Sequence, residues 1–207
     1  MIVALVFWTG TLLGEANAAS VHDMTNGRHA ALCSSRRARH HRTRQGLLNA
    51  RLFEAVKNDD FAGAEKALLK GTSPNALGYY SMTPLLWTQG FRTAELLLDH
   101  GADPNRSNKG GVTPVRLAAQ NGDMALTTLL VEHGAEVNSR DSIGQFPLLW
   151  VAFYGYIEIA DYLIQHGADV NAHDHHGQTP LSMAAGQHRD AMIIFLKNHG
   201  ATEIPHI

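Results

Sequence analysis

The sequence predicts an all-α solenoid, in which helix-turn-helix units stack in a row and carry hairpin-like tips. Two observations predict it. A turn of the form Gly-(Ala/Thr)-x-(Val/Pro)-Asn recurs four times along the chain, and a fifth copy starts at Gly200-Ala201. The last four turn glycines lie 33 residues apart, at Gly101, Gly134, Gly167 and Gly200. A proline recurs in step with these glycines, at Pro114, Pro147 and Pro180. Such a period indicates a repeat array, which presents an extended surface rather than an enclosed pocket.

Each unit contains start and stop signals for two helices. The clearest copy begins at Thr179-Pro180-Leu181 and ends at His199-Gly200-Ala201. Proline suits the first helical position because its missing N–H would have no partner there, and the preceding threonine can cap the next free N–H groups. Glycine suits the end of the second helix because it adopts the left-handed conformation readily.

Five units can be placed on this pattern. The first is divergent and runs from Leu48 to Asn75, and the boxes of the others begin at Thr83, Thr113, Phe146 and Thr179. These residues resemble the ankyrin repeat, whose units have a period of 33 residues and a Thr-Pro-Leu-His-x-Ala box. The resemblance covers residues 48–203 and leaves residues 204–207 as a short C-terminal end.

Three departures from the family pattern have local consequences. The histidine of the box is replaced by Leu86, Arg116, Leu149 and Ser182, so we expect its usual side-chain hydrogen bonds to be absent. Phe146 stands where threonine is expected, which should cost that helix about 1 kcal/mol of capping. The unit beginning at Thr83 is three residues short, so we expect its first helix to be shortened around Trp87 to Gly90.

Composition and charge restrict the classes of partner. The length of 207 residues fits one domain with a tail, and 44% hydrophobic residues are ample for a packed core. Residues 1–46 carry six Arg against two acidic residues, whereas residues 47–207 carry eleven Lys and Arg against seventeen. A mildly acidic array disfavours nucleic acid, because phosphate binding needs clustered Lys and Arg. With Cys33 as the only cysteine, neither an intrachain disulfide nor a thiolate metal cage can form.

Residues 1–19 combine features of a signal peptide with features against one. Residues 1–13 are apolar but too few to span a bilayer, which takes about 20 residues, and Ala16-Asn17-Ala18 fits a cleavage site. However, no Lys or Arg precedes the apolar run, and a basic cluster follows it from Arg36 to Arg44. Two alternatives remain open: a periplasmic or secreted protein, or a cytoplasmic one. We expect residues 20–47 to form a flexible basic linker.

The sequence contains no motif for catalysis or for a bound metal. Gly-x-Ser-x-Gly, a phosphate-binding loop, His-Glu-x-x-His and Cys-x-x-Cys are all missing, so we expect neither enzyme activity nor a cofactor. A histidine precedes each late turn glycine, and we interpret it as a helix-terminal residue suited to the negative end of the helix dipole. The cluster His173-Asp174-His175-His176 has no fourth partner at metal-site spacing, so we expect no specific metal site there.

The resemblance implies a binding set at the hairpin tips and at the exposed end of the first helix of each unit. Its members differ from unit to unit: Tyr79, Tyr80, Met82, Lys109, Val112, Gln120, Asn121, Ser142, Ile143, Gln145, Phe153, Tyr154, His175, His176, Gln178 and Gln187. The aromatic members favour a protein partner, because such side chains dominate binding energy at interfaces. The alternative for Phe153 and Tyr154 is packing between units, which we expect for the neighbouring Trp150.

The ankyrin resemblance therefore implies a non-catalytic, monomeric module that binds a protein through the concave face and the tips of the array. Two other functions are kept as alternatives. One is an accessory or protective protein of an enzyme in the bacterial envelope, which a cleaved signal peptide would suit. The other is a host-directed effector that uses the arginine cluster as an import signal. None of these functions needs a membrane-spanning helix.

Overall fold

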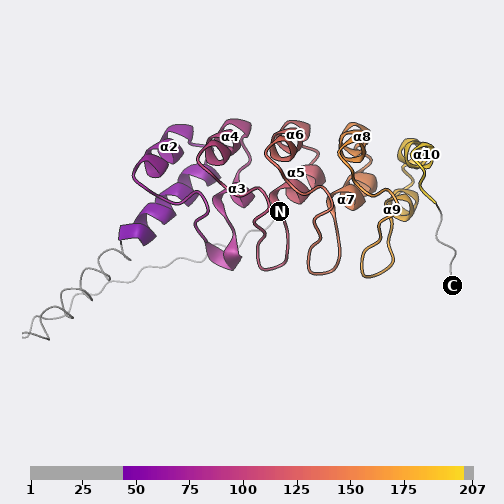
Figure 1. Cartoon of the computed structure of the whole chain (residues 1–207), viewed down its shortest axis with the longest axis horizontal. Coiled ribbons are helices and arrows are strands. Elements are labelled where there is room, and N and C mark those ends of the chain that lie inside the picture. The colour runs from indigo at the N-terminus through magenta and orange to yellow at the C-terminus, as the bar shows by residue number, and fades with distance from the viewer. Residues whose placement is uncertain (1–43, 203–207) are drawn as a thin grey trace, which may run out of the picture. The chain divides into compact units, whose positions relative to one another are not determined.

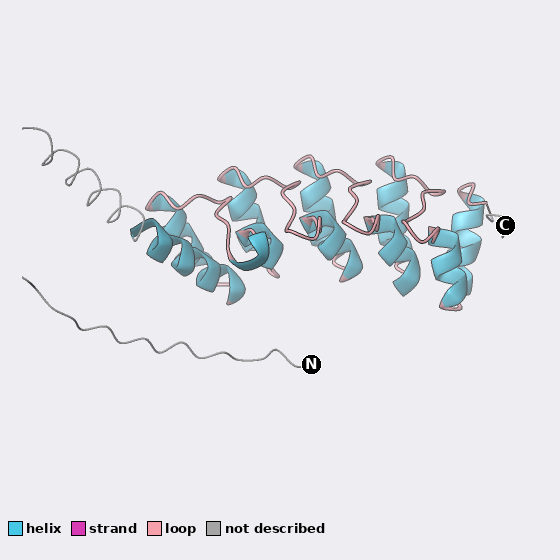
Figure 2. Ribbon diagram, turned by 90° about the horizontal axis from the view of Figure 1, so that it is seen from below, coloured by secondary structure: helices cyan, strands magenta, loops and turns pink. Residues whose placement is uncertain are grey.

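The computed structural model describes residues 44–202, which lie in the second of two compact units of the chain, residues 41–207. Every regular element in this range is a helix, in agreement with the predicted all-α class. Helix pairs follow one another in a row, and the loops between successive pairs extend to one side as tips (Figure 1). Figure 2 looks at the array from the side of the tips and shows the pairs as successive layers.

The helices form two rows, because like helices of neighbouring units pack against one another. A helix through residues 44–57 precedes both rows and pairs with α2, so helical structure begins before the predicted array boundary at residue 48. The inner row lies next to the tips and contains α3 (Pro84–Trp87), α5 (Pro114–Gln120), α7 (Pro147–Tyr154) and α9 (Pro180–Gly186). The outer row contains α2 (Phe61–Leu69), α4 (Phe91–Asp99), α6 (Met124–Glu132), α8 (Ile157–Gln165) and α10 (Asp190–Asn198).

A ladder of leucines forms the centre of the outer row. One leucine lies four residues before each late turn glycine, and all four are fully buried: Leu97, Leu130, Leu163 and Leu196. Burial of one such side chain contributes about 1.5–3 kcal/mol. Because a single helix pair cannot cover its own apolar face, this contribution depends on the neighbouring unit.

The helix termini follow most of the predicted signals. The turn glycines that end the outer helices have φ between 84° and 90°, in the left-handed region. The hydroxyl oxygens of Thr83 and Thr179 accept hydrogen bonds from the third residues of their helices, at 3.3 and 3.1 Å. The expected cap is absent at Thr113, whose hydroxyl is instead 2.8 Å from that of Ser139 in the next unit. It is also absent at Phe146, as predicted.

An asparagine ladder explains why the first four turns end in that residue. The side-chain Nδ2 of Asn138 donates to the carbonyl oxygen of Gly167 at 2.8 Å, and its Oδ1 accepts from the backbone N–H of Asp169 at 3.0 Å. Three more asparagines bond to the following turn in the same way, and these are Asn75, Asn105 and Asn171. Each asparagine thus joins two consecutive units.

The second unit is shortened where the sequence predicted. Its inner helix α3 has four residues, from Pro84 to Trp87, whereas α5 has seven. The chain leaves the helix in an extended conformation at Thr88, and α4 begins at Phe91. The lost residues therefore remove the last turn of the inner helix and leave the stacking of the outer row intact.

Candidate binding face

The tips of the third, fourth and fifth units share one local design. In each, the Oδ1 atom of an Asn or Asp accepts two backbone hydrogen bonds, from the residues two and four positions later, at 2.9–3.1 Å. These three residues are Asn108, Asp141 and Asp174. Short side chains of this type favour turns because they replace a backbone partner. The design fixes the tip backbone and leaves the intervening side chains free to vary.

Neighbouring tips are also joined through their backbones. The N–H of Ser142 donates to the carbonyl of Gly110 at 2.9 Å, and the N–H of His175 donates to that of Ile143 at 3.2 Å. The N–H of Lys109 reaches the carbonyl of Tyr80 at 3.2 Å in the same manner. The tips therefore form one connected row along the array, which presents the variable tip side chains together.

The tip of the second unit departs from this design. It is a short 3₁₀ helix, η1 (Tyr79–Ser81). Within it, Tyr80 and Ser81 have φ of 54° and 58°, a backbone region that residues other than glycine rarely adopt. The side chains of Tyr79 and Tyr80 are 78% and 64% exposed, and their ring centroids are 4.2 Å apart. A hydrogen bond with Tyr80 raises the pKa of the Tyr79 hydroxyl.

The histidine cluster at the last tip has a structural residue at its centre. Asp174 is buried, and its carboxylate accepts the backbone N–H groups of His176 and Gln178 at 2.9 Å. His175 lies over Gly144 of the preceding tip. Within residues 44–202, no group of three or more His, Cys, Asp or Glu side chains is placed to hold a metal ion.

The ends of the inner helices carry a second aromatic group. The rings of Trp150 and Phe153 have centroids 5.8 Å apart, and Tyr154 lies 5.0 Å from Phe153 and stacks on Tyr156 at 5.6 Å. Phe153 is half-buried, and Tyr154 is at the exposed edge of the group. The aromatic residues therefore pack against one another, while part of the Tyr154 side chain faces solvent.

An ion pair between the inner helix α5 and the following tip was not among the predicted functional residues. The buried guanidinium of Arg116 lies 3.0 Å from the carboxylate of Asp141, donates to the side-chain oxygens of Gln120 and Gln145, and lies 5.5 Å from the Trp150 ring centroid. Arg116 occupies the histidine position of the box, and Asp141 is the turn-forming residue of the next tip. An arginine at the histidine position of one box, together with an aspartate at the next tip, was the sequence signal that could have predicted this ion pair. Gln120 and Gln145, two predicted binding residues, therefore also hold this contact between units.

The structure places the predicted binding residues in two groups. Eleven of the sixteen are exposed and five are half-buried. One group occupies the tips, and the other, at Gln120, Asn121, Phe153, Tyr154 and Gln187, lies where the inner helices end. An inner helix of eight residues separates the groups by roughly 12 Å. A partner that contacts both must therefore extend along the inner helices.

The histidines before the turn glycines lie at the ends of the outer helices, as interpreted from the sequence. The Nδ1 atom of each ring lies 2.8–2.9 Å from the carbonyl oxygen four residues earlier, and they are His100, His133, His166 and His199. An Nδ1–H in this place donates to a carbonyl of the last helical turn that also accepts the histidine's own backbone N–H, at 3.1–3.2 Å. These side chains serve the helix ends.

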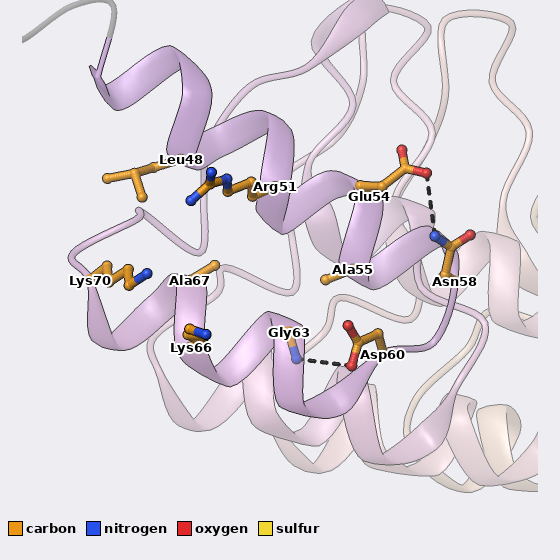
Figure 3. A pocket seen from close by; sticks show the side chains of 10 residues that line it. All are labelled: Leu48, Arg51, Glu54, Ala55, Asn58, Asp60, Gly63, Lys66, Ala67 and Lys70. Carbon is orange, nitrogen blue, oxygen red and sulfur yellow. Dashed lines mark hydrogen bonds between the residues drawn. The ribbon is translucent and has the colours of Figure 1, made fainter.

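A groove of about 350 Å³ lies at the first end of the array, between the helix of residues 44–57 and α2 (Figure 3). Its floor contains small and apolar residues, including Leu48, Ala55 and Ala67, and its walls carry both basic and acidic groups. Two of these are already engaged, since Asn58 donates to Glu54 at 3.3 Å and Asp60 caps α2 at 2.9 Å.

Comparison with known proteins identifies the family. A family model described as ankyrin repeats (3 copies) matches residues 52–141 and residues 117–204, and the two matches together span more than half of the chain. The chain therefore belongs to the ankyrin-repeat family, whose repeats are generally protein–protein interaction modules and typically non-catalytic. None of the curated proteins compared with the chain matches it.

The remaining predictions concern residues outside the described range. The signal-like residues 1–19, Cys33 and all but Arg44 of the basic cluster precede residue 44, so export, the envelope role and the effector role stay predictions. Among the helices that the structure describes, none has the length and apolar character needed to cross a bilayer.

Proposed function

We propose that this array binds a protein partner through a face formed by its tips and by the exposed ends of its inner helices. The observation that carries the proposal is the pair Tyr79 and Tyr80. Two large aromatic side chains extend into solvent from a tip whose backbone occupies the left-handed region. Such a conformation costs about 1–3 kcal/mol and tends to persist at functional sites.

The stacking of the array does not require these side chains. The hydrogen bonds from this tip to its neighbour involve the carbonyl oxygen of Tyr80 and the sulfur of Met82, whereas the two tyrosine rings contact one another. Tyrosine buries a large area on binding at a low cost in rotamer entropy, and it is enriched among residues that dominate interface energy. The aromatic group around Tyr154 supplies a second anchor at the other edge of the proposed face.

The test compares two pairs of substitutions with a matched control. A partner is captured on the full chain and identified by mass spectrometry, and its affinity as a purified protein is then measured by calorimetry. Tyr79→Ser with Tyr80→Ser should weaken binding at least tenfold, and Phe153→Ser with Tyr154→Ser should weaken it further. Thermal unfolding of each variant separates lost contacts from lost folding.

The control replaces apolar residues that are equally exposed but lie on the outer row. Leu69→Ser and Ile194→Ser remove side chains that are 76% and 62% exposed on α2 and α10. These changes should leave the affinity within about twofold. If the tyrosine pair and the Phe153 and Tyr154 pair can both be replaced without loss of affinity, the proposed face is wrong.

A further inference from the structure

The shortened unit leaves a hollow of about 370 Å³ between α3 and α5. One side is formed by the end of α3 and the segment after it, including Leu86 and Trp87. The other side is a single face of α5, because Pro114, Leu117, Ala118 and Asn121 are spaced three and four residues apart. The hollow thus opens where α3 is one turn too short to cover its neighbour.

The following unit shows what normally fills this place. The residues of the third unit that have no counterpart in the second are Ala118, Ala119 and Gln120, the last turn of α5. Ala118 and Ala119 are buried, and so are Val151 and Ala152 at the same positions of α7. The missing element is therefore a short piece of polypeptide with small apolar side chains.

The lining combines apolar side chains with polar ones and includes one charged residue. Its floor includes Leu117 and Leu126, and the ring of Trp87 stands at its edge, 39% exposed. Among the described residues that line the hollow, Asp123 is the only charged one, and its carboxylate caps α6 by accepting the N–H of Leu126 at 2.9 Å. The exposed amides of Gln89 and Asn121 lie at the edge, where they can both donate to and accept from a peptide backbone.

The geometry points to a socket for one bulky apolar side chain, presented by an uncharged segment of the bound protein partner. This inference rests on the proposed function and names a specific anchor for it. Leu, Met or Phe of the partner takes the place of the missing helical turn, while its backbone bonds to the two amides. The volume is at the lower end of the roughly 300–1,000 Å³ of ligand pockets, which suits a side chain better than a large cofactor.

Two variants fill the socket from its own walls. Insertion of Ala-Ala-Gln between Trp87 and Thr88 restores the length of the third unit and rebuilds the missing turn. Ala118→Leu fills the same space from α5 and serves as the second variant if the insertion does not fold. Ile194→Ser, on the outer row, is the control.

The probe is a peptide selected from a random display library on the full wild-type chain, then synthesised with a fluorophore. We expect selected peptides to share one Leu, Met or Phe flanked by uncharged residues. Their affinity, measured by fluorescence polarisation, should fall at least tenfold for the insertion variant or for Ala118→Leu, and should be unchanged for Ile194→Ser. Circular dichroism and thermal unfolding verify that each variant is folded.

Three outcomes would overturn the socket. One is equal affinity for the wild type and both filled variants, and another is a selected motif that is charged or lacks an apolar anchor. The third is the absence of any selected peptide. If peptides bind, depend on Tyr79 and Tyr80, and ignore the filling, the proposed binding face stands and only the socket fails.

Discussion

Phe146 stands at a position where the sequence led us to expect a net loss of stability from a missing cap. Its side chain is 1% exposed, and the guanidinium of Arg140 lies 5.1 Å from its ring centroid. Truncation of a buried Phe costs about 3–5 kcal/mol, whereas a threonine cap returns about 1 kcal/mol. We therefore predict that Phe146→Thr lowers the free energy of unfolding by about 2–4 kcal/mol, measured by urea denaturation. A neutral or stabilising result would show that capping dominates.

Asn138 makes two hydrogen bonds between consecutive turns while remaining exposed to solvent. Because each net contribution is about 0.5–1.5 kcal/mol, we predict that Asn138→Ala destabilises the array by about 1–3 kcal/mol. Asn121→Ala, at an exposed asparagine that follows α5, is the control and should change stability by less than about 0.5 kcal/mol. Equal effects of the two substitutions would contradict the proposed role of the ladder.

At the scale of single elements, the second tip is the place where the backbone conflicts with its sequence. Ser81 has φ of 58°, and the glycines of the later tips at Gly111, Gly144 and Gly177 have φ of 74–80°. The left-handed conformation costs an L-residue about 1–2 kcal/mol. Glycine avoids this cost, but part of the gain is lost because glycine gives up more conformational entropy on folding. We predict that Ser81→Gly stabilises the array by about 0.5–1 kcal/mol in chemical denaturation. Ser142→Gly, at a tip residue that does not have a positive φ, should not stabilise it.

The sequence predicted the elements well wherever one residue decides the local conformation. Turn glycines and prolines at the first helical position could be predicted because each follows from the geometry of a single residue, and the short α3 could be predicted from the three missing residues of its unit. The Arg116 cluster and the bond from Thr113 to Ser139 could not, because each joins side chains more than twenty residues apart. The sequence could predict the tip residues of the binding face, but it could not show that Gln120 and Gln145 also accept hydrogen bonds from Arg116.

At the scale of the whole molecule, stability should decline toward the last unit. The buried residues of α10 are Met192 and Leu196, and α10 has a neighbouring outer helix, α8, on one side within the described residues. A unit in the middle of the array is covered by a neighbouring unit on both sides. We therefore predict that amides of α9 and α10 exchange with solvent roughly tenfold faster than those of α7 and α8. Native-state hydrogen exchange measures this difference. Greatest protection in the last unit would contradict nearest-neighbour stabilisation.

We propose that a protein partner covers the face formed by the tips and by the ends of the inner helices. Hydrogen–deuterium exchange of the full chain, with and without its captured partner, tests this proposal. We predict slower exchange on binding in residues 79–82, 109–112, 142–145 and 175–178, with little change in α4, α6 and α8. Protection confined to those outer helices, with unchanged exchange in the tips, would contradict it.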